Sequence, residues 1–150
     1  MKLSRKAEYA MRALLAMART PDTATFSIQD IASGENIPLK FLEQILLVLK
    51  NGGLLRSKRG VGGGYQFQKA PLRITLGEIV QLIDGPFEPL RCATPFVQPG
   101  AVCECGIPGG CGLGQVFGDL RDQVNEWLNA TTLGDVLERE KTRQHLSFEI

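Results

Sequence analysis

One stretch of the chain, from Cys92 to Cys111, holds all four cysteines of the 150-residue sequence. It is also rich in glycine and proline, which exclude it from an ordinary helix or a central strand. The chain must therefore fold on either side of a thiol-rich loop. We expect one folded domain at 1–84, the cysteine-rich loop at 85–112, helices at 113–138 and a loose tail at 139–150.

The N-terminal residues are charged and lack the apolar core of a signal peptide. No window approaches the roughly 20 apolar residues that cross a bilayer. We therefore expect a cytoplasmic protein with no membrane partner. In that compartment, clustered cysteines are more often metal or redox ligands than a disulfide framework.

Charge is divided unevenly along the chain, although the net charge is only +1. Residues 1–73 contain twelve basic and five acidic side chains, whereas residues 74–150 contain five basic and eleven acidic ones. A basic first half followed by an acidic second half suggests a nucleic-acid-binding face in the first half.

Apolar residues at helical spacing predict three helices before residue 54. Ser4 is a good N-cap for the first and Ser27 for the second. Gly34 is expected to end the second helix in a left-handed conformation. Pro38 falls at the first position of the third, where a missing N–H costs nothing. The last two helices and their short connection form a helix-turn-helix pattern.

Lys40, Glu43 and Gln44 lie opposite the apolar stripe of the third helix, where a recognition helix would meet base edges. These residues alone are equally compatible with a plain helical hairpin that has a solvated polar face. The following segment favours DNA binding. Residues 54–59 read as a strand, residues 60–64 as a glycine turn and residues 65–68 as a half-buried strand.

This hairpin is a wing directly after the candidate recognition helix, and Arg56, Lys58 and Arg59 approach its tip. Glycines at the tip would let backbone N–H groups approach phosphate. A phosphate-binding P-loop is excluded because no Gly-Lys-Ser/Thr follows the glycines, and a Rossmann fingerprint is excluded because a strand follows them.

The second half begins with a capping box from Thr75 to Glu78. After the cysteine loop, a long amphipathic helix is predicted, and we expect its apolar stripe to form a homodimer interface. The stripe consists of Leu113, Val116, Phe117, Leu120, Val124, Trp127 and Leu128. Thr132 and Asp135 can cap a last short helix. The predicted fold class is mainly α with a small β-hairpin wing: a winged helix-turn-helix plus a long C-terminal dimerisation helix.

An enzyme with reactive thiols is the competing class of function. The chain lacks a Cys-x-x-Cys motif, a nucleotide fingerprint and a histidine near the thiols, so we do not expect an enzyme.

Several motifs resemble the Rrf-type winged-helix transcription regulators, and the likeness runs from about Met1 to Leu137. The motifs lie at 6–10, 41–45, 59–65, 77–80 and 122–137, and the cysteine loop reinforces them. The resemblance implies a homodimeric repressor that binds a double-stranded DNA operator, with Arg59 in the minor groove. The expected DNA-binding set is Ser4, Arg5, Ser27, Pro38, Lys40, Glu43, Gln44, Arg56, Lys58, Arg59, Gly60, Gly62 and Gly63.

The resemblance also implies an iron–sulfur cluster in the loop, [2Fe-2S] in preference to [4Fe-4S], that sets DNA affinity. Cys92, Cys105 and Cys111 match the family cysteines, and the fourth ligand is either the additional Cys103 or Glu8. For Glu8 the competing interpretation is an exposed acid or an ion pair one helical turn along the chain. The loop chemistry itself leaves a thiol–disulfide switch and a zinc site open. A regulator without a cluster that senses a partner protein is a further alternative.

Overall fold

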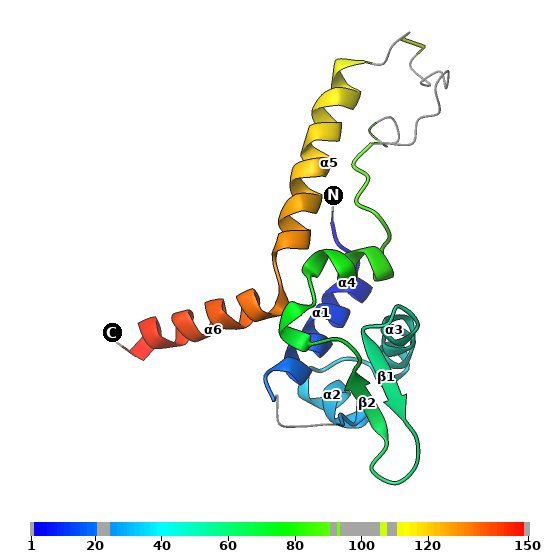
Figure 1. The fold of residues 1–150 in the computed structure, drawn as a ribbon, viewed down its shortest axis with the longest axis vertical. Coiled ribbons are helices and arrows are strands. Elements are labelled where there is room, and N and C mark those ends of the chain that lie inside the picture. The colour runs from blue at the N-terminus through cyan, green and yellow to red at the C-terminus, as the bar shows by residue number, and fades with distance from the viewer. Residues whose placement is uncertain (1, 21–24, 91–92, 94–105, 108–110, 149–150) are drawn as a thin grey trace.

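The computed structural model describes residues 2–20, 25–90, 93, 106–107 and 111–148, with side chains as far as Arg143 at the C-terminal end. Most of the chain is helical, and the two strands form one antiparallel hairpin (Figure 1). This confirms the predicted fold class. The elements are α1 (Arg5–Ala18), α2 (Ile28–Gly34), α3 (Leu39–Asn51), β1 (Leu55–Lys58), β2 (Gly64–Phe67), the 3-10 helix η1 (Pro71–Arg73), α4 (Leu76–Ile83), α5 (Gly112–Ala130) and α6 (Leu133–Phe148).

The hydrophobic core lies where α1, α3 and α4 pack together. The apolar stripes of α1 and α3 meet there because leucines, isoleucines and alanines recur every three or four residues. Later elements add Ile74, Ile79 and Leu133, all fully buried. The core therefore joins the helix-turn-helix to the start of α6.

The turn between α2 and α3 differs from the prediction at Gly34. Gly34 is the last residue of α2, and the left-handed residue is Asn36, with φ 52°. Asparagine tolerates this conformation because its short polar side chain can hydrogen-bond locally. Ile37 is then buried and Pro38 occupies the N-cap of α3, one position before the predicted one.

Two capping boxes begin α4 and α6. Thr75 accepts from the N–H of Glu78, whose carboxylate accepts from the N–H of Thr75 at 2.9 Å. Asp135 and Thr132 repeat this arrangement, with an N–H to carboxylate distance of 2.8 Å. Both predicted N-caps are therefore present.

The two capped segments are also joined to each other through the backbone. The N–H of Leu76 donates to the carbonyl of Thr131 at 2.9 Å, and the N–H of Leu133 donates to the carbonyl of Ile74 at 2.9 Å. This short antiparallel bridge ties the α5–α6 connection to the start of α4. Because α4 packs on α1 and α3, the bridge connects the C-terminal helices to the N-terminal half of the chain.

Helix α6 continues to Phe148, so the expectation of a short last helix followed by a loose tail from residue 139 is wrong. Its first turns are held against the body by Glu140, which accepts from both Nε and a terminal nitrogen of Arg19 at 3.0 and 2.7 Å. These bonds lower the pKa of Glu140, while the pKa of Arg19 is raised. In Figure 1, α5 rises from the body as an arm and α6 leaves in a different direction. Across the described ranges, no helix is both long and apolar enough to span a bilayer.

Candidate nucleic-acid interface

One side of α3 is polar and exposed, as the sequence predicts. Lys40, Glu43 and Gln44 are all exposed, whereas Leu42 and Ile45 on the opposite side are fully buried. The buried side fixes how α3 sits on α1 and α4, so the three polar side chains are turned away from the body. They could hydrogen-bond to base edges, with Glu43 as an acceptor from cytosine and Gln44 as a partner for adenine.

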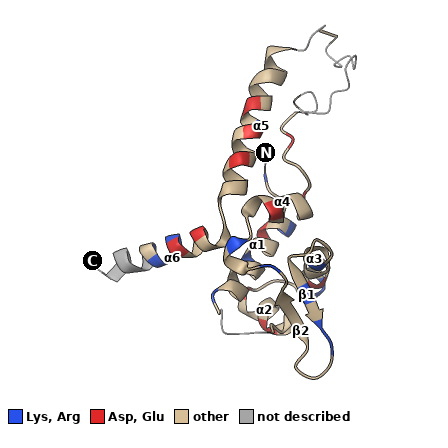
Figure 2. Cartoon of the chain, in the orientation of Figure 1, with Lys and Arg blue, Asp and Glu red and all other residues tan. Residues whose placement is uncertain are grey.

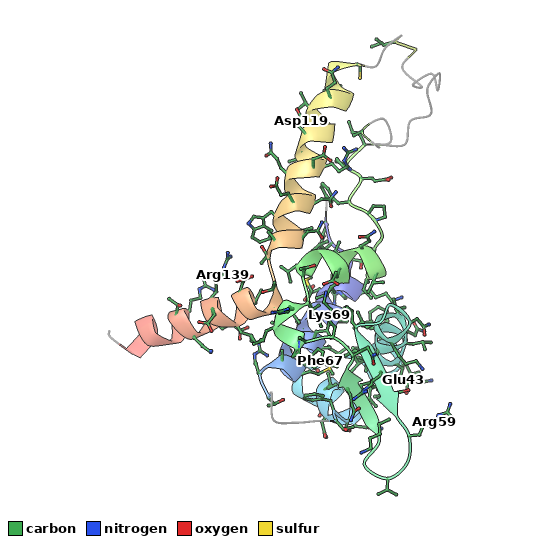
Figure 3. All side chains as sticks on the ribbon, in the orientation of Figure 1. Glu43, Arg59, Phe67, Lys69, Asp119 and Arg139 are labelled. Atoms are coloured by element: carbon green, nitrogen blue, oxygen red, sulfur yellow. The ribbon has the colours of Figure 1, made fainter. Side chains whose placement is uncertain are left out.

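The wing lies next to α3 in the chain and on the same side of the molecule. Figure 3 shows Arg59, directly after β1, and Glu43, on α3, directed to that side. The strands pair from Leu55 opposite Phe67 to Lys58 opposite Gly64. Beyond them the tip turns at Gly60 and Gly62, whose φ angles of 93° and 71° require glycine. The predicted turn and the predicted basic strand are therefore both present.

The wing is anchored to the helix-turn-helix through residues that precede α2. Phe26 and Tyr65 exchange two backbone hydrogen bonds, at 2.8 and 2.9 Å. Gln66 adds a side-chain link, because its Nε2 donates to Thr25 at 2.8 Å and its Oε1 accepts from Arg56 Nε at 3.0 Å. Arg56 is thus oriented by its cross-strand neighbour. Sequence reasoning missed the role of Gln66, although its position opposite Arg56 could have suggested it.

The start of α1 carries the predicted phosphate contacts Ser4 and Arg5, and both residues are exposed. The Ser4 hydroxyl accepts from Ala7 N–H at 3.0 Å, as an N-cap should. Ser4 also donates from its N–H to Asp84 at 2.9 Å and from its hydroxyl to the same carboxylate. Asp84 caps α4 directly before residues 85–112. An acid therefore already occupies the place where Ser4 was predicted to meet phosphate.

Ser27, at the start of α2, is the other helix-start residue predicted to contact DNA. Its hydroxyl accepts from Asp30 N–H at 3.4 Å and lies 3.0 Å from Gln29 Oε1. Ser27 therefore acts as the N-cap of α2.

Charge is distributed over the molecule as the sequence suggests. Figure 2 shows basic residues on the wing strand and acidic residues along α5. The acidic side chains on α5 are Asp119, Asp122 and Glu126, all exposed. DNA phosphates would therefore be attracted to the wing and repelled by the α5 arm.

The predicted metal ligands are only partly described. Cys92, Cys103 and Cys105 lie outside the described residues. Cys111 is a free cysteine at the N-cap of α5, half-buried. Among the described residues, no three His, Cys, Asp or Glu side chains form a group that could hold a metal ion. A thiol at the first turn of a helix suits a cluster or zinc ligand, because thiolates favour both and the helix dipole stabilises negative charge.

Glu8, the alternative fourth ligand, forms an ion pair with Arg12, which is the competing interpretation of this residue. Its carboxylate lies 3.8 Å from a terminal nitrogen of Arg12, one turn along α1, and Glu8 is exposed. Arg12 also reaches the Glu35 carboxylate at 3.4 Å and stacks 5.5 Å from the ring centre of Tyr9. The exposed Glu8 pair is weak, so it would not prevent the carboxylate from binding elsewhere.

The predicted dimer stripe lies on α5, which has no buried residue in the single chain. Leu113 and Val116 are each 64% exposed, and Trp127 is 52% exposed. Arg139 of α6 lies 6.0 Å from the Trp127 ring centre. The other members of the stripe, Phe117, Leu120, Val124 and Leu128, are half-buried.

Comparison with known proteins agrees with this geometry. Residues 3–139 match the family model described as "Rrf2: Iron-dependent Transcriptional regulator". The chain is 31% identical over 150 residues to the HTH-type transcriptional regulator IscR of Cronobacter sakazakii, covering 97% of this chain and 88% of the relative.

Solved structures of cysteine regulators are also similar. The structure of CymR, the global cysteine regulator of B. subtilis, aligns with a TM-score of 0.74 and 30% identity, covering 93% of this chain and 98% of that one. The oxidised form of Staphylococcus aureus CymR aligns with a TM-score of 0.69 and 29% identity, covering 91% of this chain and 95% of that one.

Proposed function

The chain belongs to the Rrf2 family of transcriptional regulators, and from this premise we propose that it is a homodimeric repressor whose operator affinity is set by an iron–sulfur cluster in the cysteine loop. Members of this family bind DNA and are not enzymes.

The observation that carries the DNA-binding mode is the common direction of Glu43 on α3 and Arg59 on the wing (Figure 3). A recognition helix enters the major groove, and a wing beside it can reach the neighbouring minor groove. Arg59 would insert there, where negative potential attracts arginine. Lys58 and Arg5 would contact phosphates, which position the protein without reading sequence.

The exposed apolar stripe of α5 supports the proposed dimer. A patch that includes Leu113, Val116 and Trp127 is costly to leave in water and is covered when two copies pack together. A two-fold dimer would place two α3 helices on half-sites one helical turn apart, about 34–36 Å.

The cluster would be held by Cys111 and by further cysteines of the loop, with Cys103 or Glu8 as the fourth ligand. The cluster itself would be the responsive group, because it can be oxidised, nitrosylated or lost. The protein's own part is mechanical. Asp84, the last residue before the loop, accepts a hydrogen bond from Ser4 at the start of α1. A change in the loop would therefore shift the position of α1, a helix that faces DNA. Loss of the cluster would shift the population of DNA-binding conformations.

An anaerobic purification tests the cluster directly. We expect a coloured protein containing iron and acid-labile sulfide, and Cys111→Ser should lose both while remaining folded by circular dichroism. Colourless wild-type protein without iron or sulfide would exclude the cluster and leave the family assignment intact.

Substitution of Arg59 tests the wing. We expect Arg59→Ala to weaken operator binding roughly tenfold and to make the affinity less salt-dependent by about one charge. Arg73→Ala, which removes another exposed positive charge, from η1, is the matched control. Equal effects of the two substitutions at matched salt would exclude a specific role for the wing.

A thiol–disulfide switch is the second candidate, favoured by the likeness to the oxidised form of S. aureus CymR. Two loop thiols would lose two electrons and two protons to a peroxide or a disulfide and form one S–S bond. Titration of free thiols before and after peroxide treatment of metal-free protein distinguishes this case, because a switch loses two thiols and regains them with a reductant.

A further inference from the structure

Two exposed side chains on α3 are apolar: Leu39, 39% exposed, is the first residue of the helix, and Leu47 lies in its third turn. Leu47 is 49% exposed, whereas the four core residues of this helix, Leu42, Ile45, Leu46 and Leu49, are all fully buried. The core is therefore complete without Leu47. Single exposed leucines are common on protein surfaces, so exposure alone does not indicate a functional role for Leu47. Its position on the helix is the deciding observation.

Leu47 lies on the same face as the polar residues of α3. It follows Gln44 by three residues, Glu43 by four and Lys40 by seven, and these are the spacings that share one side of a helix. All four side chains are exposed. A helix that enters the major groove with Glu43 and Gln44 would carry Leu47 in with them.

We propose that Leu47 is a specificity-determining residue that packs against the 5-methyl group of a thymine in the operator. In the major groove, the thymine methyl is the apolar feature that distinguishes a T·A pair from the others. A leucine cannot hydrogen-bond to a phosphate or to a base edge, so its favourable partner there is this methyl. The same chemistry is offered by 5-methylcytosine. The inference rests on the proposed function, in which α3 reads the major groove.

The helix geometry limits where this thymine can lie. Leu47 stands about 6 Å further along the helix axis than Glu43, at 1.5 Å per residue. Base pairs are about 3.4 Å apart along the duplex. The contacted thymine should therefore lie within about two base pairs of the base that Glu43 reads.

The test uses the full-length protein, purified anaerobically, and a duplex that this protein selects from a randomised pool. Each thymidine of the duplex is replaced in turn by deoxyuridine, which removes only the methyl group. For wild-type protein we expect a loss of affinity of about fourfold at one or two positions per half-site, as burial of one methyl group predicts. For Leu47→Ala the same replacements should cost less than twofold. Leu72→Ala, at an exposed leucine of η1 away from α3, should retain the wild-type pattern.

Further arms separate the possible outcomes. Deoxyuridine penalties that are the same in wild-type protein and in Leu47→Ala would overturn the assignment. At the sensitive pair, cytosine and then 5-methylcytosine are also tested. Recovery of affinity with 5-methylcytosine in wild-type protein but not in Leu47→Ala supports methyl recognition from either base, and recovery in both proteins contradicts it.

Protein that selects no sequence, or an unchanged preference in Glu43→Ala, would refute the proposed groove reading itself. A selected sequence with no effect of deoxyuridine would refute only the role of Leu47.

Discussion

Replacing Gly64 with alanine should detach the wing from the helix-turn-helix. A Cβ at Gly64 would lie 2.2 Å from the carbonyl oxygen of Phe26 and 2.9 Å from its carbonyl carbon. Contacts under 3.0 Å are essentially never made by real Cβ atoms, and both atoms belong to the backbone. The strand and the segment before α2 must therefore separate by about 0.8 Å, which is the difference between the 2.2 Å contact with the Phe26 oxygen and the 3.0 Å limit.

That separation removes the two hydrogen bonds between Phe26 and Tyr65. Their lengths of 2.8 and 2.9 Å would increase to about 3.6 Å, beyond a useful hydrogen bond. At about 1 kcal/mol for each bond, and with some loss at the Gln66–Thr25 bond, the cost is about 2–3 kcal/mol. The positive φ of 157° at Gly64 adds backbone strain for alanine, and the lower chain entropy of unfolded alanine offsets about 0.5 kcal/mol of the total. We expect a net loss of about 2 kcal/mol in the free energy of unfolding and a fall in Tm of roughly 4–8 °C.

The assay combines thermal unfolding at fixed protein concentration with amide hydrogen exchange. Gly62→Ala is the control, because it makes the same change in the same hairpin where nothing lies within 4 Å of the added Cβ. Its cost should be confined to the positive φ of 71°, about 1 kcal/mol. The amides of Phe26 and Tyr65 should lose protection in Gly64→Ala and keep it in Gly62→Ala. Protected amides and a Tm within 1 °C of wild type in Gly64→Ala would refute the reasoning.

Two further predictions concern the helices behind the wing. Hydrogen bonds from Arg19 lower the pKa of Glu140, so the pair stabilises the fold above the ordinary glutamate pKa of 4.5 and this contribution is lost as the pH falls through the lower, folded-state value. Because Glu140 is about one-third exposed, Glu140→Gln should cost less than about 1 kcal/mol in urea unfolding at pH 7. This cost should shrink progressively as the pH falls below 4.5, and a pH-independent difference would contradict the assignment. Thr75→Ala should lower the free energy of unfolding by about 1 kcal/mol because the α4 capping box is lost. Thr75→Ser should retain most of this stability, because serine can make the same capping bond. Equal losses in the two variants would exclude the cap as the cause.

Much of the fold follows from local patterns. The stripes of α1 and α3, the capping box at Thr75 and the glycine turn of the wing are each set by residues within a few positions of one another. Backbone preference and the hydrophobic effect act on them directly. The confirmed fold class reflects these local signals.

The parts that sequence did not predict depend on contacts between distant residues. The length of α6 was underestimated because its stabilising partner, Arg19, is 121 residues from Glu140. The engagement of Ser4 by Asp84 spans 80 residues. Gly34 was expected to reverse the chain because glycine is the commonest left-handed residue, yet Asn36 does so. For the cysteine loop, residue type predicts the ligand chemistry, while ligand choice depends on a folded geometry that spacing does not determine.

The bridge between Thr75 and Thr132 makes α5 a lever. The helix has 19 residues, so it extends for about 28 Å from this pivot to Cys111 at its far end. A shift of about 3 Å at Cys111 turns such a rigid arm of about 28 Å by only about 6°, and a force applied at Cys111 acts about the pivot as a torque proportional to the length of the arm. The cysteine end can therefore move over ångströms without disturbing base contacts in proportion. What the arm transmits to α4 is a small rotation under torque, not a displacement of the same size as the one at Cys111.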